Sequence, residues 1–173
     1  MIPAETPGAT IWDPAVDASC IVPRLWQGSV LRGDQLHARG FDVICLCAKD
    51  FQPDTTYFGG LRVIRARLTD GELTAHDWHD ARDAGRHVAQ AWREGKRVLV
   101  ACIAGQNRSG LVMALALSEL TSMPMNAVIG HVRACRKDAL NTKAFVHRLL
   151  GLTDAERRVR EPLAIPWPPA RAA

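Results

Sequence analysis

The stretch "VLVACIAGQNRSG", residues 98–110, joins an apolar strand to an apolar helix through one short loop. The predicted strand ends at Cys102, and the predicted helix begins near Arg108. Between them lies Gly105, a residue whose backbone can adopt the conformations that a tight turn needs. A loop in this position directs consecutive backbone N–H groups and the positive end of a helix dipole toward one point. The stretch therefore predicts an anion site with a cysteine inside it.

The residue types in this loop suit phosphate chemistry. The field that binds a phosphate also favours a thiolate over a thiol, which makes a cysteine at a helix N-terminus beside a cation a good nucleophile. The planar guanidinium of Arg108 can bind two phosphate oxygens at once, and the Ser109 hydroxyl is close enough in sequence to hydrogen-bond the sulfur. The alternative for Cys102 is a small apolar residue that simply ends a strand.

Strand and helix signals alternate on both sides of this loop. The stretch 41–48, "FDVICLCA", is almost entirely apolar, as expected of a strand buried on both faces, and 61–68 alternates between apolar and polar residues. A strand or hairpin over 21–29 and a strand over 96–102 complete the set. Helices are predicted over 29–40, from 74 onward, and over 111–120, 126–137 and 141–152. This order predicts an α/β fold: a single compact domain with a mostly parallel central sheet flanked by helices.

The ends of the chain differ from its middle. Residues 1–18 are rich in Pro, Ala, Thr and Asp and are interpreted as an extended lead-in, and 153–173 as a Pro/Arg-rich tail, which leaves 19–152 as the domain. The longest apolar run, "LVMALAL", is too short to span a membrane, and the N-terminus lacks the pattern of a signal peptide. We therefore expect no membrane span and a cytoplasmic location.

Composition limits the function classes further. Five cysteines, with no CxxC pair, favour free thiols in a reducing compartment over a disulfide framework or a zinc site. The segment "HDWHD", 76–80, places histidine and aspartate one helical turn apart, but it fits the polar side of an amphipathic helix better than a metal site. The net charge of +4 is scattered, so it suits an anionic substrate as well as a nucleic acid. The oligomeric state is open, with a monomer as the default.

The loop resembles the Cys-x5-Arg signature of the cysteine-dependent protein tyrosine phosphatase superfamily, and in particular its dual-specificity branch. The likeness extends to "CIVPRLWQGS" (20–29), "GFDVICLCAKD" (40–50) and "NAVIGHVRACRKDALNTKAFVHRLLGL" (126–152), and it covers roughly residues 19–152. The resemblance implies a dual-specificity phosphatase-like fold. It also implies hydrolysis of phosphotyrosine, phosphoserine or phosphothreonine in proteins through a cysteinyl-phosphate, with neither metal nor cofactor.

Roles for individual residues follow from this resemblance. Cys102 is the nucleophile, Arg108 binds the phosphate, and Ser109 helps the sulfur to leave. Asp70, in "LTDGE" 32 positions before the cysteine, is the general acid, with Asp50 and Asp54 as weaker substitutes. The backbone amides of the loop bind the phosphate oxygens, and they belong to Ile103, Ala104, Gly105, Gln106, Asn107 and Arg108.

One departure from the family pattern, the uncharged loop and one extra cysteine qualify the resemblance. Ala101 stands where the superfamily usually has a histidine that helps to hold the loop, so a phosphate-binding pseudophosphatase of low or no activity is an alternative. The uncharged loop disfavours a phosphoinositide, while its "GxNR" portion keeps an RNA 5′-phosphate as a further alternative. Cys47 corresponds to a cysteine that can form a reversible disulfide with the nucleophile in tensin-type phosphatases. A Cys47–Cys102 pair is therefore a hypothesis, beside the interpretation of Cys47 as a core residue.

Overall fold

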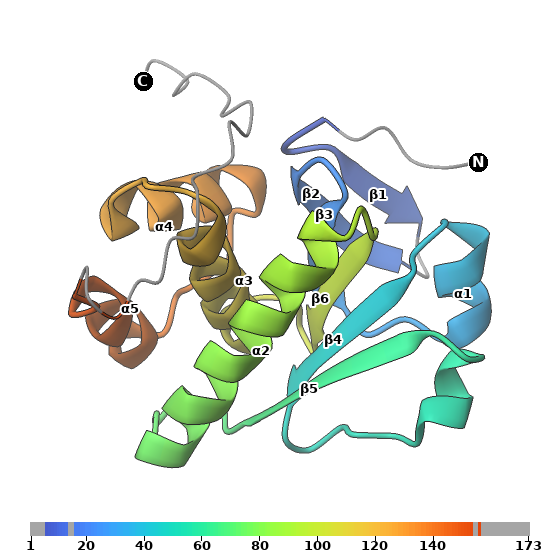
Figure 1. Ribbon diagram of the computed structural model, residues 1–173, viewed down its shortest axis with the longest axis horizontal. Helices are drawn as coiled ribbons and strands as arrows, with labels where there is room; N and C mark the ends of the chain where they lie inside the picture. The colour runs from blue at the N-terminus through green and yellow to red at the C-terminus, as the bar shows by residue number, and fades with distance from the viewer. Residues whose placement is uncertain (1–5, 14–15, 154–155, 157–173) are drawn as a thin grey trace.

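A six-stranded sheet forms the middle layer of the molecule (Figure 1). The computed structural model describes residues 6–13, 16–153 and 156. The strands are β1 (Thr10–Asp13), β2 (Val16–Val22), β3 (Leu25–Ser29), β4 (Val43–Ala48), β5 (Arg62–Leu68) and β6 (Val98–Cys102). Their order is β1-β2-β3-β6-β4-β5, with β3, β6, β4 and β5 parallel and the first two strands antiparallel. The predicted α/β class with a mostly parallel central sheet is confirmed.

Helices cover both faces of this sheet (Figure 1). They are α1 (Gly33–Ala38), the short 3-10 helix η1 (Thr55–Phe58), α2 (Ala75–Arg93), α3 (Asn107–Leu120), α4 (Met125–Cys135) and α5 (Lys143–Leu150). The larger apolar core lies between the sheet and the helices α2 to α5, and a smaller one lies under α1 and η1. None of the helices in the described ranges is long and apolar enough to cross a membrane.

The sequence signals for individual elements have clear structural counterparts. Every residue of β4 is buried, and from Val43 to Cys47 successive side chains enter the two cores in turn, as a strand with two covered faces requires. In β5, Ile64, Ala66 and Leu68 face the core as predicted. At the start of α2 the Thr74 hydroxyl accepts from the Asp77 backbone N–H at 3.1 Å, while the Asp77 carboxylate accepts from the Thr74 N–H at 3.0 Å.

The amino-terminal part of the sheet begins earlier than the sequence indicated. The expected boundary at residue 19 falls inside β2, because Val16–Val22 forms one strand whose residues from Ala18 onward pair antiparallel with β3. The turn between these strands lies at Pro23–Arg24, where Arg24 has a φ of 66°. The predicted tail at 153–173 lies outside the described residues except for Thr153 and Glu156.

The close approach of β2 and β3 gives a stability prediction. A Cβ on Gly28 would lie 2.2 Å from the carbonyl oxygen of Asp17 and 2.8 Å from the Cα of Ala18. We expect Gly28→Ala to lower the free energy of unfolding by about 1–3 kcal/mol, since backbone must move to admit the methyl group. The matched control is Gly130→Ala inside α4. A Cβ added there would have no heavy atom within 4 Å apart from its chain neighbours and the backbone of its own helix. That change should stabilise by about 0.5–1 kcal/mol through helix propensity. Urea unfolding of the two variants measures both effects, and equal behaviour would contradict the close packing.

Candidate active site

The topology brings three loops together at one edge of the sheet. Strands β4, β5 and β6 are parallel, so their carboxyl ends point the same way, and β6 lies between β3 and β4. The loops that leave these three ends carry Asp50, Asp70 and the segment 102–108, which we call the signature loop. Ligands of open α/β sheets bind outside the carboxyl ends of the strands, so this edge is where a site is expected.

The signature loop requires a glycine at position 105. Gly105 has a φ of +63°, in the left-handed region, and a Cβ there would lie 2.4 Å from the carbonyl carbon of Gly28. The loop therefore packs directly on β3. Helix α3 begins at Asn107, immediately after this turn, so the first backbone N–H groups of a 14-residue helix open toward the loop.

Cys102 sits at the bottom of this loop. Its side chain packs in the larger core, and the residue is 2% exposed. The sulfur donates to the Ser109 hydroxyl oxygen at 3.3 Å, and Ser109 is itself fully buried in the first turn of α3. If the thiol loses its proton, the same contact can reverse, with the hydroxyl donating to the sulfur. The structure thus brings together the cysteine and serine that the sequence predicted as partners.

Arg108 connects the loop to two carboxylates. Its side chain is 7% exposed; Nη1 donates to Oδ1 of Asp50 at 2.5 Å, and Nη2 lies 3.7 Å from Oδ2 of Asp70. Both aspartates are more than half exposed. The sequence favoured Asp70 and gave Asp50 a weaker claim, whereas the structure places both beside the same guanidinium, with Asp50 the nearer. Asp54 caps η1, where it accepts from the Thr56 N–H at 3.3 Å.

The two carboxylates near Arg108 differ in their suitability as an acid. The hydrogen bond from Arg108 lowers the pKa of Asp50 below its ordinary value, and its own backbone N–H adds to this effect. An acid that donates a proton to a leaving group must hold that proton at working pH. Asp50 paired with Arg108 is therefore poorly suited to donate a proton, and Asp70 stays the predicted acid.

The carbonyl groups of the signature loop are bound from behind. Nε2 of Gln27 donates to the oxygens of Gly105 and Gln106 at 3.1 and 3.2 Å. Arg136, at the end of α4, donates from Nε to the Gly105 oxygen at 2.5 Å and from Nη2 to the Ala104 oxygen at 3.4 Å. Sequence reasoning missed both residues, because neither lies near the loop in sequence. A polar Gln27 in an otherwise buried strand was the one available signal.

Other loop residues also have defined surroundings. The side-chain oxygen of Asn107 accepts from the backbone N–H groups of Asn141 and Thr142 at 2.7 and 3.1 Å, so this side chain fastens the start of α5 to the loop. Ile103 and Ala104 are exposed at the mouth. The backbone amides of residues 103–108 thus lie in the turn that joins β6 to the start of α3.

The position before Cys102 is part of the opposite core. Ala101 is fully buried and packs in the cluster under α1 with Leu46 and Trp26, because successive strand residues face opposite sides of the sheet. The side chain at position 101 therefore lies on the face of the sheet opposite to that of Cys102. The departure at Ala101 therefore removes a polar group from an otherwise apolar layer.

The cysteines are all free thiols, Cys47 among them. The sulfur of Cys47 lies 3.9 Å from that of Cys45. Burial raises the pKa of the Cys47 thiol well above its usual value, and the neighbouring Cys45 and Cys102 raise it further. A Cys47–Cys102 disulfide stays a prediction.

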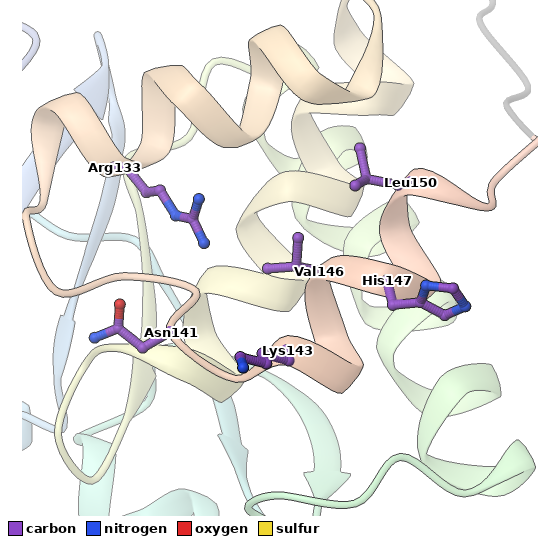
Figure 2. A pocket seen from close by; sticks show the side chains of 6 residues that line it. All are labelled: Arg133, Asn141, Lys143, Val146, His147 and Leu150. Atoms are coloured by element: carbon purple, nitrogen blue, oxygen red, sulfur yellow. The ribbon is translucent and has the colours of Figure 1, made fainter.

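Two further features lie outside the signature loop. His76 and Asp80 form an ion pair at 3.7 Å on α2, and the described residues include no group of three or more side chains that could hold a metal ion. A shallow pocket of about 240 Å³ lies beside α5 and the end of α4 (Figure 2). It is lined by Arg133, Asn141, Lys143, Val146, His147 and Leu150.

Comparison with known proteins places the fold. No family model matches the chain, and no curated protein matches it. Among solved structures, Tk-PTP in its active form is 23% identical with a TM-score of 0.69, covering 86% of this chain and all of that one. Human DUSP28 is 20% identical at 0.66, covering 82% and 94% of the two chains. A human tyrosine phosphatase-like serine/threonine/tyrosine-interacting protein is 19% identical at 0.62, covering 76% and 92%.

These likenesses confirm the fold that the motifs implied. The chain has the single-domain α/β architecture of dual-specificity and tyrosine phosphatase structures over nearly all of its described length. At such low identities the likeness concerns the fold, and the function has to be argued from the site itself.

Proposed function

We propose that the protein is a cysteine-dependent phosphatase that hydrolyses phosphomonoesters in phosphoproteins. The observation that carries this proposal is the joint placement of a buried Cys102 and Arg108 in one loop, with Asp70 beside the same guanidinium. A nucleophile, an anion clamp and a carboxylate thus share one site at the edge of the sheet. Each is of the residue type that phosphoryl transfer to sulfur requires.

The first step transfers the phosphoryl group to sulfur. The Cys102 thiolate attacks phosphorus and forms an S–P bond while the bond between phosphorus and the ester oxygen breaks. The bonding electron pair leaves with that oxygen, which takes a proton from Asp70 and departs as a neutral alcohol or phenol. Arg108 and the backbone amides of residues 103–108 bind the equatorial oxygens, where negative charge is spread in the transition state.

The second step returns the enzyme to its starting state. A water molecule attacks phosphorus and gives a proton to the Asp70 carboxylate, the S–P bond breaks, and its electron pair returns to Cys102. The hydroxyl of Ser109, in contact with that sulfur at 3.3 Å, donates to the thiolate as it leaves. Inorganic phosphate is released, and every group that takes part is supplied by this chain or by water.

The surroundings of the loop favour a protein substrate. Ile103 in the loop is 49% exposed and Tyr57 is 44% exposed, and Tyr57 packs edge-on against Phe51, the neighbour of Asp50. An apolar rim of this kind suits the ring of phosphotyrosine or the side chains of a peptide. Two of the three arginines of β5 that could serve a polyanion are already engaged: Arg62 pairs with Glu94, and Arg65 donates to Gln52 and Pro53, while Arg67 is exposed.

One contact favours a second candidate function, phosphate binding without turnover. The Asp50 carboxylate takes up a donor of Arg108 that a phosphate would need, so substrate has to displace it. A protein that binds phosphate only weakly, or that binds it and does not attack it, would have such an arrangement together with Ala101.

A substrate panel tests the proposed function. We expect release of inorganic phosphate from phosphotyrosine, phosphoserine or phosphothreonine peptides, with the aryl ester fastest because a phenol is the better leaving group. An RNA 5′-triphosphate and a soluble phosphoinositide should be turned over at least roughly tenfold more slowly, since one lost charged contact is worth about that factor. Turnover of RNA or phosphoinositide alone would overturn the phosphoprotein assignment. Binding of all the anions with turnover of none would favour the second candidate.

A further inference from the structure

We propose that Asp17, on the amino-terminal strand β2, is a positioning residue that holds the signature loop through Arg136. This inference rests on the proposed phosphatase function. Asp17 lies just ahead of residues 19–152, the range over which the sequence motifs resemble those of phosphatases.

The guanidinium of Arg136 is the centre of the arrangement. It is 9% exposed and forms a two-point ion pair with Asp17: Nη1 donates to Oδ1 at 2.9 Å, and Nη2 donates to Oδ2. Its Nε and Nη2 donate to the carbonyl oxygens of Gly105 and Ala104, and Nη1 also lies 3.3 Å from the Ser19 hydroxyl. Asp17 thus fixes one edge of a planar fork whose other edge holds the loop.

The backbone around this fork is tightly packed. The Cα atoms of Ala18 and Gly28 are partners in the β2–β3 ladder, and the Asp17 carbonyl lies against Gly28. Gly28 in turn lies against Gly105, and a Cβ on Gly105 would be 2.6 Å from Nη2 of Arg136. The strand, the guanidinium and the loop are therefore in direct contact, and a shift in one displaces the next.

The geometry distinguishes this ion pair from an ordinary surface pair. Exposed ion pairs contribute little unless they are bidentate and held by their surroundings, and the Asp17–Arg136 pair meets both conditions on its buried side. Without Asp17, Arg136 would carry an uncompensated charge in a buried place, which favours its release toward water. The Gly105 and Ala104 carbonyls would then lose a donor, and the loop amides that oppose them would lose their alignment.

The hydrogen bonds from Arg136 also provide support to the loop where Ala101 stands in place of the superfamily's usual histidine. Ala101 packs in the far core and contributes no polar contact to the loop through its side chain. Gln27 from β3 and Arg136 from α4 both bind the Gly105 oxygen, so the two donors grip one carbonyl of the turn. Of these two supports, only that of Arg136 depends on a second side chain, Asp17.

Replacement of Asp17 by Asn tests the proposal. We expect kcat on an aryl phosphate to fall by about 10²-fold, the effect of a small misplacement of reacting groups, with a smaller change in KM. The affinity for inorganic tungstate, a non-hydrolysable oxyanion, should weaken by roughly tenfold. Asp34→Asn is the matched control, because Asp34 also pairs with an arginine but is 66% exposed at the start of α1. It should leave both quantities unchanged.

The direction of the tungstate effect separates positioning from simple charge. If Asp17 acted only as a nearby negative charge, its removal would reduce repulsion and tungstate would bind more tightly, which would overturn the proposal. Unchanged tungstate affinity and kcat would overturn it as well. A melting temperature of Asp17→Asn close to that of the wild type would show that the loss of kcat and of tungstate affinity does not come from partial unfolding.

A second pair of variants tests the fork itself. Arg136→Lys keeps the charge but cannot bind Asp17 and two loop carbonyls in one plane, so it should lose activity and tungstate affinity as Asp17→Asn does. The double variant should be little worse than either single one, because both break the same unit. Additive losses would contradict the coupling. Since tungstate binding does not require turnover, these comparisons remain decisive even if the wild type hydrolyses nothing, which would instead count against the proposed function.

Discussion

Replacement of Cys102 by Ser should abolish turnover, while the protein should still bind oxyanions. We expect kcat to fall by about 10⁴–10⁶-fold, the scale seen when a nucleophile is removed from a site whose other groups remain. A serine hydroxyl has nearly the shape of the thiol, so it fits the buried position that is 2% exposed. It does not, however, ionise at neutral pH. Steady-state rates with an aryl phosphate measure the loss.

Oxyanion affinity is the companion measurement for this variant. Arg108 and the loop amides are unchanged in Cys102→Ser, so tungstate should bind with an affinity close to that of the wild type. Cys47→Ser is a matched control for the loss of a buried sulfur, and it should retain turnover because the hydrogen bonds of the Cys47 sulfur are to Cys45 on the same strand and the proposed mechanism does not use it. Residual activity above one hundredth of wild type in Cys102→Ser would contradict covalent catalysis through this sulfur.

Replacement of Asp70 by Asn should give the second largest loss, and its size should depend on the leaving group. With phenyl phosphate we expect kcat to fall by about 10²–10⁴-fold, since the departing oxygen then leaves without a proton. With a strongly activated ester such as 2,4-dinitrophenyl phosphate the loss in kcat/KM, which reports the first step alone, should nearly disappear, whereas kcat should still fall because hydrolysis of the cysteinyl-phosphate lacks its base. The fall in kcat/KM on the alkaline side of the pH profile, which reports loss of the acid's proton, should flatten. The pH dependence of kcat and of kcat/KM for both esters measures this.

Asp50→Asn is the control that separates the two carboxylates. Because Arg108 holds the pKa of Asp50 low, Asp50 stays charged and occupies the guanidinium until the pH falls through that lowered value. Its replacement should leave the alkaline limb intact and tighten tungstate binding above this pH, since a competing anion is gone. A large leaving-group-dependent loss in Asp50→Asn, with little effect in Asp70→Asn, would transfer the role of acid to Asp50.

The parts of the fold that the sequence predicted are those encoded in short windows. The capping residues Thr74 and Asp77 mark the start of α2. The alternation of side chains in 61–68 identifies the buried face of β5. The passage from strand to glycine to helix around Cys102 predicted both the loop and its partner Ser109. Each of these signals needs only local periodicity or a fixed spacing, so no knowledge of tertiary contacts is required.

The parts that escaped prediction depend on contacts between distant segments. Asp17 and Arg136 are separated by 119 positions, and nothing near either residue in sequence indicates the other. Asp50 and Asp70 both follow strands, so the sequence does not indicate which carboxylate lies nearer to Arg108. The three-dimensional arrangement shows that it is Asp50. Strand β1 was not predicted from the sequence. It is an edge strand that pairs with β2.

The most direct test of the central claim is to trap the covalent intermediate. The wild type and Asp70→Asn are mixed with an activated aryl phosphate, quenched in acid within the first turnover, digested, and analysed by mass spectrometry. The proposed mechanism predicts one phosphoryl group on the peptide that contains Cys102. It also predicts a larger trapped fraction in Asp70→Asn, where the water that attacks the intermediate lacks its base. An active wild type that carries no phosphoryl group on Cys102, or carries it on another residue, would contradict the account.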